Sequence, residues 1–192
     1  QGLLDDAYVL PVVMGWMFLP MKPYHAGGDA ASFEPYAQHL EVYDFALKQY
    51  LGAGCAMTFR GDRLYDTKGD ASYQTIKERV AWFKAYRDIL ISDIVHVRRP
   101  TGQGLDAFMH VNPRLPTHRA MAMVFNPTDE PIKSNVILNL YYAGLTDEAS
   151  VLAEGDDAAT NMKLARDYTI SVPVSLEART ASWVLMCVPS GC

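Results

Sequence analysis

The chain of 192 residues is 49% hydrophobic and 20% charged, so it can bury a core and does not have the composition of a disordered chain. Its net charge of −5 excludes the basic surface that nucleic-acid-binding proteins present to phosphates. No apolar run reaches the roughly 20 residues that a membrane-spanning helix needs. We therefore expect no nucleic-acid partner and no membrane insertion.

The amino-terminal part of the chain predicts a strand, a loop and a helix. Residues 8–21 are nearly all apolar, which is typical of a parallel strand that helices cover on both faces. The polar, glycine-containing residues 22–29 follow as an active-site loop or as a plain connector. Apolar residues at helical spacing predict a helix over 32–51, with Ser32 as its N-cap and Gly52 as its stop.

A second strand and helix follow. Residues 55–59 are apolar, and the polar residues 60–63 come directly after them. A buried strand that ends in charged residues is how α/β enzymes build sites. The next helix is predicted over 72–90, so residues 8–90 form two βα units. Two units cannot close a barrel, and residues 1–6 resemble the interior of a longer protein, so we expect a fragment, a processed chain or part of a larger protein.

Beyond residue 90 the helical periodicity stops and short alternating segments begin. Turn signals such as Asn112-Pro113 and Asn126-Pro127 separate these segments. The spacing predicts an antiparallel β-sandwich over 91–192, after an incomplete barrel domain over 1–90, and residues 155–161 are expected to form a loop. The predicted strands are 94–98, 107–111, 120–125, 135–142, 149–153, 168–174 and 182–188.

Three cysteines, Cys55, Cys187 and Cys192, cannot all pair within the chain. Buried free thiols are the simplest interpretation, and pairing of Cys187 with Cys192 is the alternative. Trp183 is expected in the sandwich core. His96 and His110 fall in predicted strands and are expected on a sheet surface.

This succession resembles the C-terminal third of α-galactosidase-like glycoside hydrolases, in which the end of a (β/α)8 barrel precedes a small antiparallel sandwich. The resemblance covers roughly residues 15–186. It is carried by WFKAYRDIL at 82–90 leading into SDIVHVRRP at 92–100, by MAMVFNP at 121–127 and by VPVSLEAR at 172–179.

The resemblance implies a pair of carboxylates that flank the sugar, about 5 Å apart in a retaining enzyme. In such enzymes these residues lie on mid-barrel strands, which here would precede Gln1. No residue of this chain matches either catalytic motif, so the catalytic residues stay unknown. The 192 residues alone are not expected to hydrolyse a glycoside by that mechanism.

Five residues are candidate sugar contacts. Arg60, Asp62 and Asp66 follow a predicted strand at the edge where barrel enzymes bind substrate, and they could fork hydrogen bonds to sugar hydroxyls. His25 lies in the first loop, and Trp16 could stack on a sugar face. The alternatives are an Arg–Asp pair that only stiffens its loop and a loop histidine without a function. No metal-ligand spacing and no cofactor motif occurs, so no metal and no cofactor are predicted.

The sequence thus predicts the C-terminal segment of a carbohydrate-active enzyme, which contributes one wall of the sugar site and a structural sandwich. Its partners would be a carbohydrate substrate and the remainder of the barrel, or another chain, packed on residues 1–90. A non-catalytic subunit of a larger assembly and a carbohydrate-binding module are the alternatives. The compartment stays open, since secretion and the periplasm are both compatible with this class.

Overall fold

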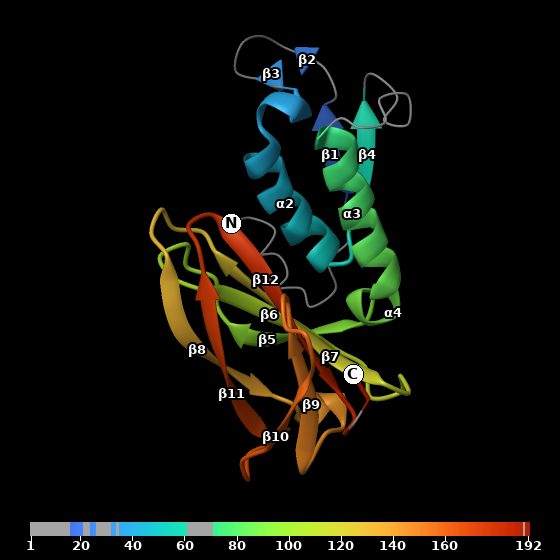
Figure 1. Ribbon diagram of the computed structural model, residues 1–192, viewed down its shortest axis with the longest axis vertical. Coiled ribbons are helices and arrows are strands. Elements are labelled where there is room, and N and C mark those ends of the chain that lie inside the picture. Colours follow the sequence, from blue (N-terminus) through green and yellow to red (C-terminus); the bar gives the residue numbers. More distant parts are fainter. Residues whose placement is uncertain (1–15, 21–23, 26–31, 34, 61–70, 190) are drawn as a thin grey trace. The chain divides into compact units, whose positions relative to one another are not determined.

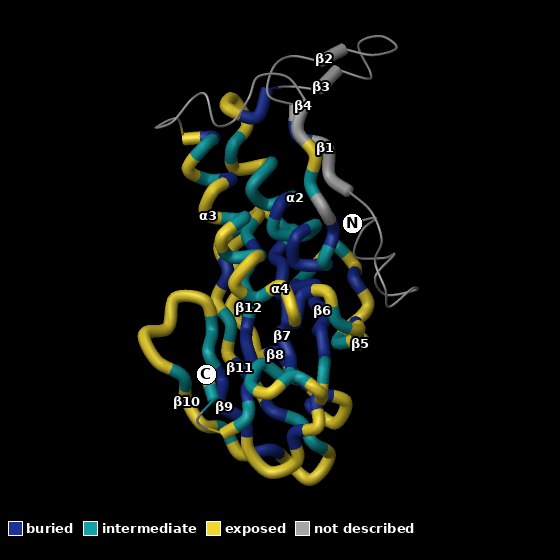
Figure 2. The backbone as a smooth tube through the Cα atoms, turned by 90° about the vertical axis from the view of Figure 1, so that its right-hand side faces the viewer, coloured by how far each residue is buried: buried dark blue, intermediate teal, exposed yellow. Residues whose placement is uncertain are grey.

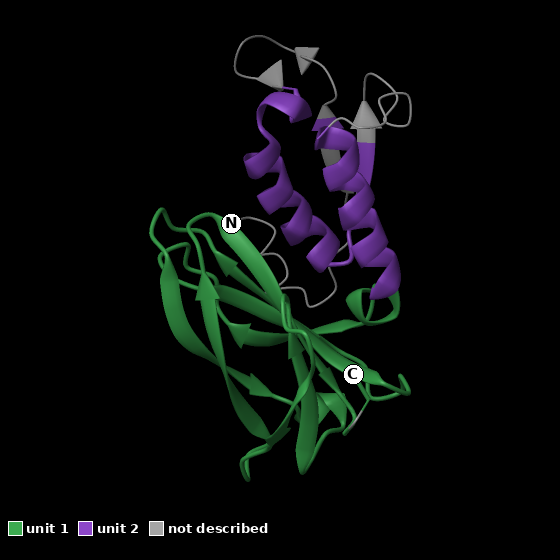
Figure 3. Cartoon of the chain, in the orientation of Figure 1, with its two compact units in different colours: residues 1–13, 87–192 green, residues 14–86 purple. Residues whose placement is uncertain are grey.

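The structure is a computed structural model that describes residues 16–20, 24, 25, 32, 33, 35–60, 71–189, 191 and 192. The chain divides into two compact units, which Figure 3 distinguishes by colour. We call the described residues within 14–86 the βα unit and those within 87–192 the sandwich unit.

The βα unit contains two parallel strands joined through a helix (Figure 1). Strand β1 (Trp16–Pro20) pairs in parallel with β4 (Ala56–Arg60), and α2 (Leu40–Gly52) lies between them in sequence. Helix α3 (Ala71–Ala85) follows β4. This is the predicted strand–helix–strand–helix order. Three shorter elements precede α2, namely β2 (Tyr24–His25), β3 (Ser32–Phe33) and the 3-10 helix η2 (Tyr36–Gln38).

Both predicted helices differ from the observed ones at one end. Helix α2 begins at Leu40, whereas the prediction placed its N-cap at Ser32, which instead lies in β3. Pro35 is extended, with ψ of 141°, and leads into a 3-10 turn, so the α-helix cannot begin before it. The predicted helix over 72–90 is broken after Ala85, and a separate short helix, α4 (Arg87–Leu90), follows.

Helices α2 and α3 are joined by a two-pronged ion pair. The Arg79 guanidinium donates from Nε and Nη2 to the two carboxylate oxygens of Asp44, at 2.6 and 2.9 Å. This fork geometry suits arginine and carboxylate, and both side chains are mostly buried. The Tyr36 hydroxyl is also buried nearby. Burial first, and then the charge of Asp44, raise the pKa of this hydroxyl, which therefore stays protonated at neutral pH.

The sandwich unit consists of two antiparallel sheets. The larger sheet has the strand order β10-β9-β12-β7-β6-β5, and the smaller one pairs β8 with β11. The strands are β5 (Asp93–Arg98), β6 (Asp106–Val111), β7 (His118–Asn126), β8 (Ile132–Asn139), β9 (Glu148–Ala153), β10 (Thr160–Lys163), β11 (Thr169–Leu176) and β12 (Thr180–Cys187). The predicted antiparallel sandwich is thus confirmed, and the 3-10 helix η4 (Tyr141–Ala143) follows β8.

Strand β7 is buried on both faces, as the dark tube in Figure 2 shows. Its small residues, Ala120, Ala122 and Val124, join the core between the two sheets. Because side chains alternate along a strand, Met121, Met123 and Phe125 lie on the opposite face. All six are at most 1% exposed. Helix α4 lies against β6 and β7 in the same unit.

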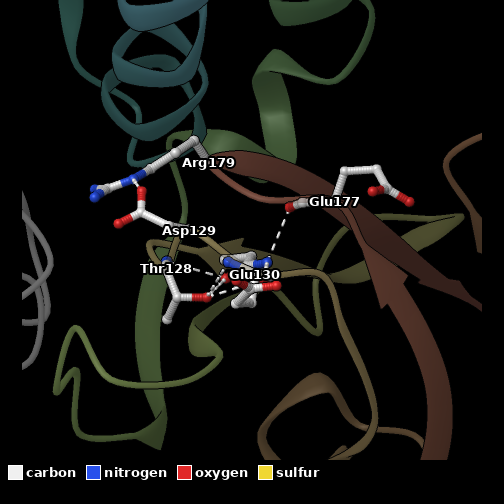
Figure 4. A network of polar contacts seen from close by, with 6 residues as sticks. Thr128, Asp129, Glu130, Glu177 and Arg179 are labelled. Carbon is white, nitrogen blue, oxygen red and sulfur yellow. Dashed lines mark hydrogen bonds and ion pairs between the residues drawn. The ribbon is translucent and has the colours of Figure 1, made fainter.

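A buried asparagine at the end of β7 ties the two sheets together (Figure 4 shows its partners). Asn126 is 0% exposed, and its Nδ2 lies 2.8, 3.3 and 2.9 Å from the carbonyl oxygens of Glu130, Leu176 and Glu177. Its Oδ1 accepts hydrogen bonds from the backbone N–H and the hydroxyl of Thr128, at 3.0 and 2.7 Å. One side chain therefore satisfies polar groups from the β7–β8 connection and from the end of β11.

An exposed ion pair lies next to this network. The Arg179 Nε donates to Asp129 at 2.9 Å, and the two side chains point toward one another in Figure 4. The hydrogen bond to Arg179 holds the pKa of the Asp129 carboxyl below its ordinary value. Solvent screens such a pair, so the buried Asn126 contributes more to stability than this ion pair.

Four further predictions need correction. The predicted strand over 135–142 ends at Asn139. The predicted loop over 155–161 overlaps strand β10, which begins at Thr160 and was missed because its sequence is mostly polar. Trp183 is only half-buried and lies outside the core between the sheets. His110 is 1% exposed rather than on the surface, with Nδ1 3.1 Å from the Ser92 carbonyl, whereas His96 is exposed as predicted.

The cysteines also differ from the simplest interpretation. Cys187, at the end of β12, forms a disulfide with Cys192, and Cys55 is free and buried. Burial raises the pKa of the Cys55 thiol, which makes it a poor nucleophile at neutral pH. The Cys192 sulfur also lies 3.4 Å from the Ser150 carbonyl on the neighbouring strand β9. The disulfide therefore ties the chain terminus to the large sheet.

Replacing Asn126 by Ala should lower the free energy of unfolding by about 3 kcal/mol, because several buried backbone groups lose their partner at once. Urea unfolding of the wild-type and variant chains measures this difference. The matched control is Asn161→Ala in β10, where the side chain is exposed and the change should stay within about 0.5 kcal/mol. Equal effects of the two substitutions would show that Asn126 does not join the sheets.

Thiol titration in denaturant tests the disulfide. The chain as isolated should release one thiol, that of Cys55, and three after reduction. Cys192→Ser should lower stability by about 2 kcal/mol, the value expected when a loop this short is no longer closed in the unfolded chain. Three reactive thiols without reductant would contradict the pairing.

Candidate functional site

The backbone places the predicted sugar-contact edge at the carboxyl ends of two parallel strands. Arg60 is the last residue of β4 and stands opposite Pro20, the last residue of β1. Two neighbouring carboxyl ends at one edge are the arrangement on which barrel enzymes build substrate sites. Asp62 and Asp66, predicted to follow on the same edge, lie outside the described residues.

The two remaining predicted contacts lie elsewhere in the βα unit. Trp16 is the first residue of β1 and pairs with Ala56, so the register does not bring its backbone beside Arg60. At the usual rise of a strand, the two ends of β1, Trp16 and Pro20, are about 13 Å apart. His25 lies in β2, where it pairs with Ser32 of β3. Its position after β1 is that of the predicted strand-to-helix loop.

A second candidate site lies within the sandwich unit and was not predicted from the sequence. It is a cavity of about 640 Å³, which we call the tyrosine pocket. The sequence signal that could have revealed it is the pair Tyr141–Tyr142, directly beyond the alternating residues of β8. The pocket is lined by Ile94, Val95, His96, Asn139, Tyr141, Tyr142 and Tyr168.

Three tyrosine rings gather at this pocket. The Tyr141 ring centroid is 5.2 Å from that of Tyr168 and 5.3 Å from that of Tyr142, with interplanar angles of 53° and 80°. Tyr141 is 57% exposed and Tyr142 is 64% exposed. The rings therefore stabilise one another as aromatic pairs while they present apolar surface to solvent.

Asn139 fixes the chain segments that carry these rings. Its Oδ1 accepts a hydrogen bond from the Tyr141 N–H at 3.0 Å, and its Nδ2 donates to the Asp167 carbonyl at 3.0 Å. The Leu140 N–H donates to the Tyr168 carbonyl at 2.9 Å. Two of these hydrogen bonds, to the Asp167 and Tyr168 carbonyls, join the turn after β8 to the turn before β11, and the third closes the turn after β8 on itself.

Tyr168 has an unusual backbone conformation, with φ of +64°. Its N–H donates to the Ala165 carbonyl at 3.0 Å, and the Ala165 N–H donates to the Thr169 carbonyl at 2.9 Å, so it occupies the left-handed position of a tight turn. Glycine is the usual residue there, and a bulky side chain at positive φ is rare. Next to it, the Thr169 hydroxyl donates to Asp167 at 2.7 Å and lowers the pKa of that carboxyl.

Neither a metal site nor a membrane helix is found in the part of the chain that the structure describes. Among these residues, no three His, Cys, Asp or Glu side chains come together in a way that could hold a metal ion. The helices within the same described ranges are too short or too polar to cross a membrane.

Comparison with known proteins identifies the fold. No protein-family model matches the sequence, and no curated protein is similar to it. Solved structures do match, and among them are several glycoside hydrolases. A proposed α-N-acetylgalactosaminidase from Bacillus halodurans superposes with a TM-score of 0.53 at 13% identity, over 90% of this chain and 38% of that one.

Two further structures are similar. A GH27 β-L-arabinopyranosidase from Geobacillus stearothermophilus, in complex with arabinose, gives a TM-score of 0.53 at 10% identity, over 90% of this chain and 36% of its own. AmyP in complex with maltose gives 0.51 at 12% identity, over 83% and 37%. This chain thus spans less than two fifths of each. Its fold, βα units before an antiparallel sandwich, is thus similar to that of part of each of these structures.

Because Tyr168 lies in a left-handed turn, we expect Gly and Ala substitutions there to rank in stability opposite to their order in a helix. Tyr168→Gly should be more stable than Tyr168→Ala by about 1 kcal/mol, because only glycine adopts positive φ without a steric penalty. Tyr73, within helix α3, is the matched control, and there the Ala variant should exceed the Gly variant by about 1 kcal/mol. Thermal unfolding of the four variants measures both differences. The same order at both positions would contradict the observed turn.

Proposed function

We propose that this chain is the C-terminal segment of a carbohydrate-active enzyme of the glycoside hydrolase type. Residues 1–90 would be terminal βα units of its barrel, and residues 91–192 its sandwich domain. One observation carries the proposal. The parallel β1–β4 pair with α2 and α3, followed by an antiparallel sandwich, has the same fold as part of several glycoside hydrolases over 90% of this chain.

The barrel edge would form one wall of the sugar site. Arg60, Asp62 and Asp66 would hydrogen-bond to sugar hydroxyls, because a guanidinium donates and a carboxylate accepts in forked geometry. His25 would extend this wall from the first loop. Trp16 would stack on a sugar only from another side, since the register separates its backbone from Arg60. The support is the position of Arg60 at the carboxyl end of β4.

The catalytic carboxylates would come from other strands. Glycoside hydrolases need two of them on either side of the scissile bond, and this chain spans only 36–38% of the length of two of the matched enzymes. The remainder of the barrel is therefore the proposed partner of residues 1–90, and hydrolysis is a property of the assembled barrel. The bound sugar in the arabinopyranosidase structure supports a carbohydrate as substrate class.

The sandwich domain would have a mainly structural role. Strand β7 is buried on both faces, as a central strand of a layered domain is. The disulfide between Cys187 and Cys192 supports a secreted or periplasmic location, because disulfides persist in oxidising compartments.

The intact mass of the natural polypeptide tests the proposal at least cost. Mass spectrometry of the protein from its source should give a value well above 21.4 kDa, because the missing barrel strands belong to the same chain or remain bound to it. Denaturing and native measurements separate these two cases. A mass near 21.4 kDa under both conditions would contradict the enzyme segment and favour an independent, non-catalytic subunit.

The wall residues are tested in the full-length enzyme. Asp62→Asn should raise KM about tenfold and leave kcat within about threefold, because it removes a binding contact and not a catalytic group. Asp88→Asn, which removes the same charge from the exposed surface of α4, is the control and should change neither constant. Complete loss of turnover in a folded Asp62→Asn enzyme would identify a catalytic carboxylate and overturn the assignment.

A further inference from the structure

The tyrosine pocket is formed entirely by the sandwich unit, so its chemistry can be considered apart from the barrel edge. Its lining combines apolar residues at β5, Ile94 and Val95, with polar-tipped residues, His96 and the three tyrosines. Among the described residues that line it, none is Asp, Glu, Lys or Arg. Its volume of about 640 Å³ is within the range of small-molecule sites, about 300–1,000 Å³.

Two features distinguish this pocket from an ordinary surface hollow. Neighbouring aromatic side chains usually bury most of their surface, yet Tyr141 and Tyr142 are 57% and 64% exposed. Tyr168 holds its ring beside Tyr141 from a left-handed position that favours glycine. Such strain persists where the surrounding structure enforces it, and it is concentrated at ligand sites.

We propose that the tyrosine pocket binds a sugar ring of a neutral glycan. The C–H groups of a pyranose or furanose ring carry partial positive charge, and the faces of tyrosine rings carry partial negative charge, so the two stack. The tyrosine hydroxyls and the His96 imidazole provide donors and acceptors for sugar hydroxyls. A lining without charged side chains suits a ligand without charge, whereas a phosphate or carboxylate ligand requires a cation.

The pocket is preorganised for this ligand. Two hydrogen bonds join Asn139 and Leu140 to the neighbouring turn, and a third, from the Tyr141 N–H to Asn139, fixes the backbone of the turn that carries Tyr141. A tyrosine side chain has few rotatable bonds, so it loses little conformational entropy when a ligand binds. Asn139 thus acts as a positioning residue, while Tyr141 and Tyr142 make the contacts. This site goes beyond the proposed function, because its lining residues belong to the sandwich unit, whereas the proposed sugar wall belongs to the βα unit.

Saturation-transfer NMR of the 192-residue chain tests the site. The probes are methyl α-D-galactopyranoside, L-arabinose, maltotriose and cellotetraose, with D-galacturonate as a charged comparison. At least one neutral probe should bind, and Tyr141→Ala/Tyr142→Ala should weaken that binding by about tenfold or more. Ile137→Ala, which removes a 56% exposed apolar side chain from β8 outside the pocket lining, is the control and should leave binding unchanged.

Several results would overturn the proposal. These are no binding of any neutral probe, binding that the double substitution leaves intact, and tighter binding of D-galacturonate than of the neutral sugars. A dimer in analytical ultracentrifugation that the double substitution disperses would show that the tyrosines contact a second copy instead. Intact mass and turnover report on the proposed enzyme, and sugar binding reports on this pocket, so either can fail without the other.

Discussion

The burial of β7 on both faces is the constraint on which the sandwich unit depends. Its alternation of small residues with Met121, Met123 and Phe125 gives the strand two different faces. The small face allows the β8–β11 sheet to pack closely, and the large face needs a cover of its own. Within the unit, α4 supplies part of that cover. A strand with this pattern belongs in the interior of a sheet, and β7 lies there, between β6 and β12.

The smaller sheet is held at its two ends by asparagine side chains. The β8–β11 ladder runs from Ile132 opposite Leu176 to Asn139 opposite Thr169. At the first end, buried Asn126 joins the sheets through backbone groups. At the other end, exposed Asn139 joins two turns and positions the tyrosines. A two-stranded sheet is only marginally stable alone, so these side-chain hydrogen bonds add to the stability of the β8–β11 pair.

Much of the fold could be predicted from the sequence because it is encoded in local periodicity. The alternation in residues 136–140 and 168–172 predicted β8 and β11, and the apolar segment 55–59 predicted β4. The predicted start of α2 was wrong because proline is compatible with a first helical turn as well as with the extended conformation that Pro35 adopts. Strand β10 was not predicted because it forms through its pairing with β9, which the polar sequence of β10 itself does not indicate.

The complete tyrosine pocket could not be predicted for the same reason, although the pair Tyr141–Tyr142 is visible in the sequence. Residues 139–142 and Tyr168 are far apart in sequence, and only the β8–β11 register brings them together. Nothing in the local pattern indicates that Tyr168 takes a left-handed conformation usually left to glycine. The disulfide between Cys187 and Cys192 could not be predicted with certainty either, because the spacing of two cysteines does not determine the geometry of the turn between them. The helices and strands with a clear local pattern can thus be predicted from this sequence, whereas sites that depend on turn geometry cannot.

The proposed function requires that β1 and β4 belong to the end of a sugar-binding barrel. A crystal structure of the natural polypeptide with a bound neutral sugar tests it most directly. We expect β1 and β4 to be neighbouring strands of a closed barrel, with a sugar at their carboxyl edge within hydrogen-bonding distance of Arg60 or Asp62. A barrel that closes without these strands, or a substrate site to which their carboxyl edge contributes no residue, would contradict it.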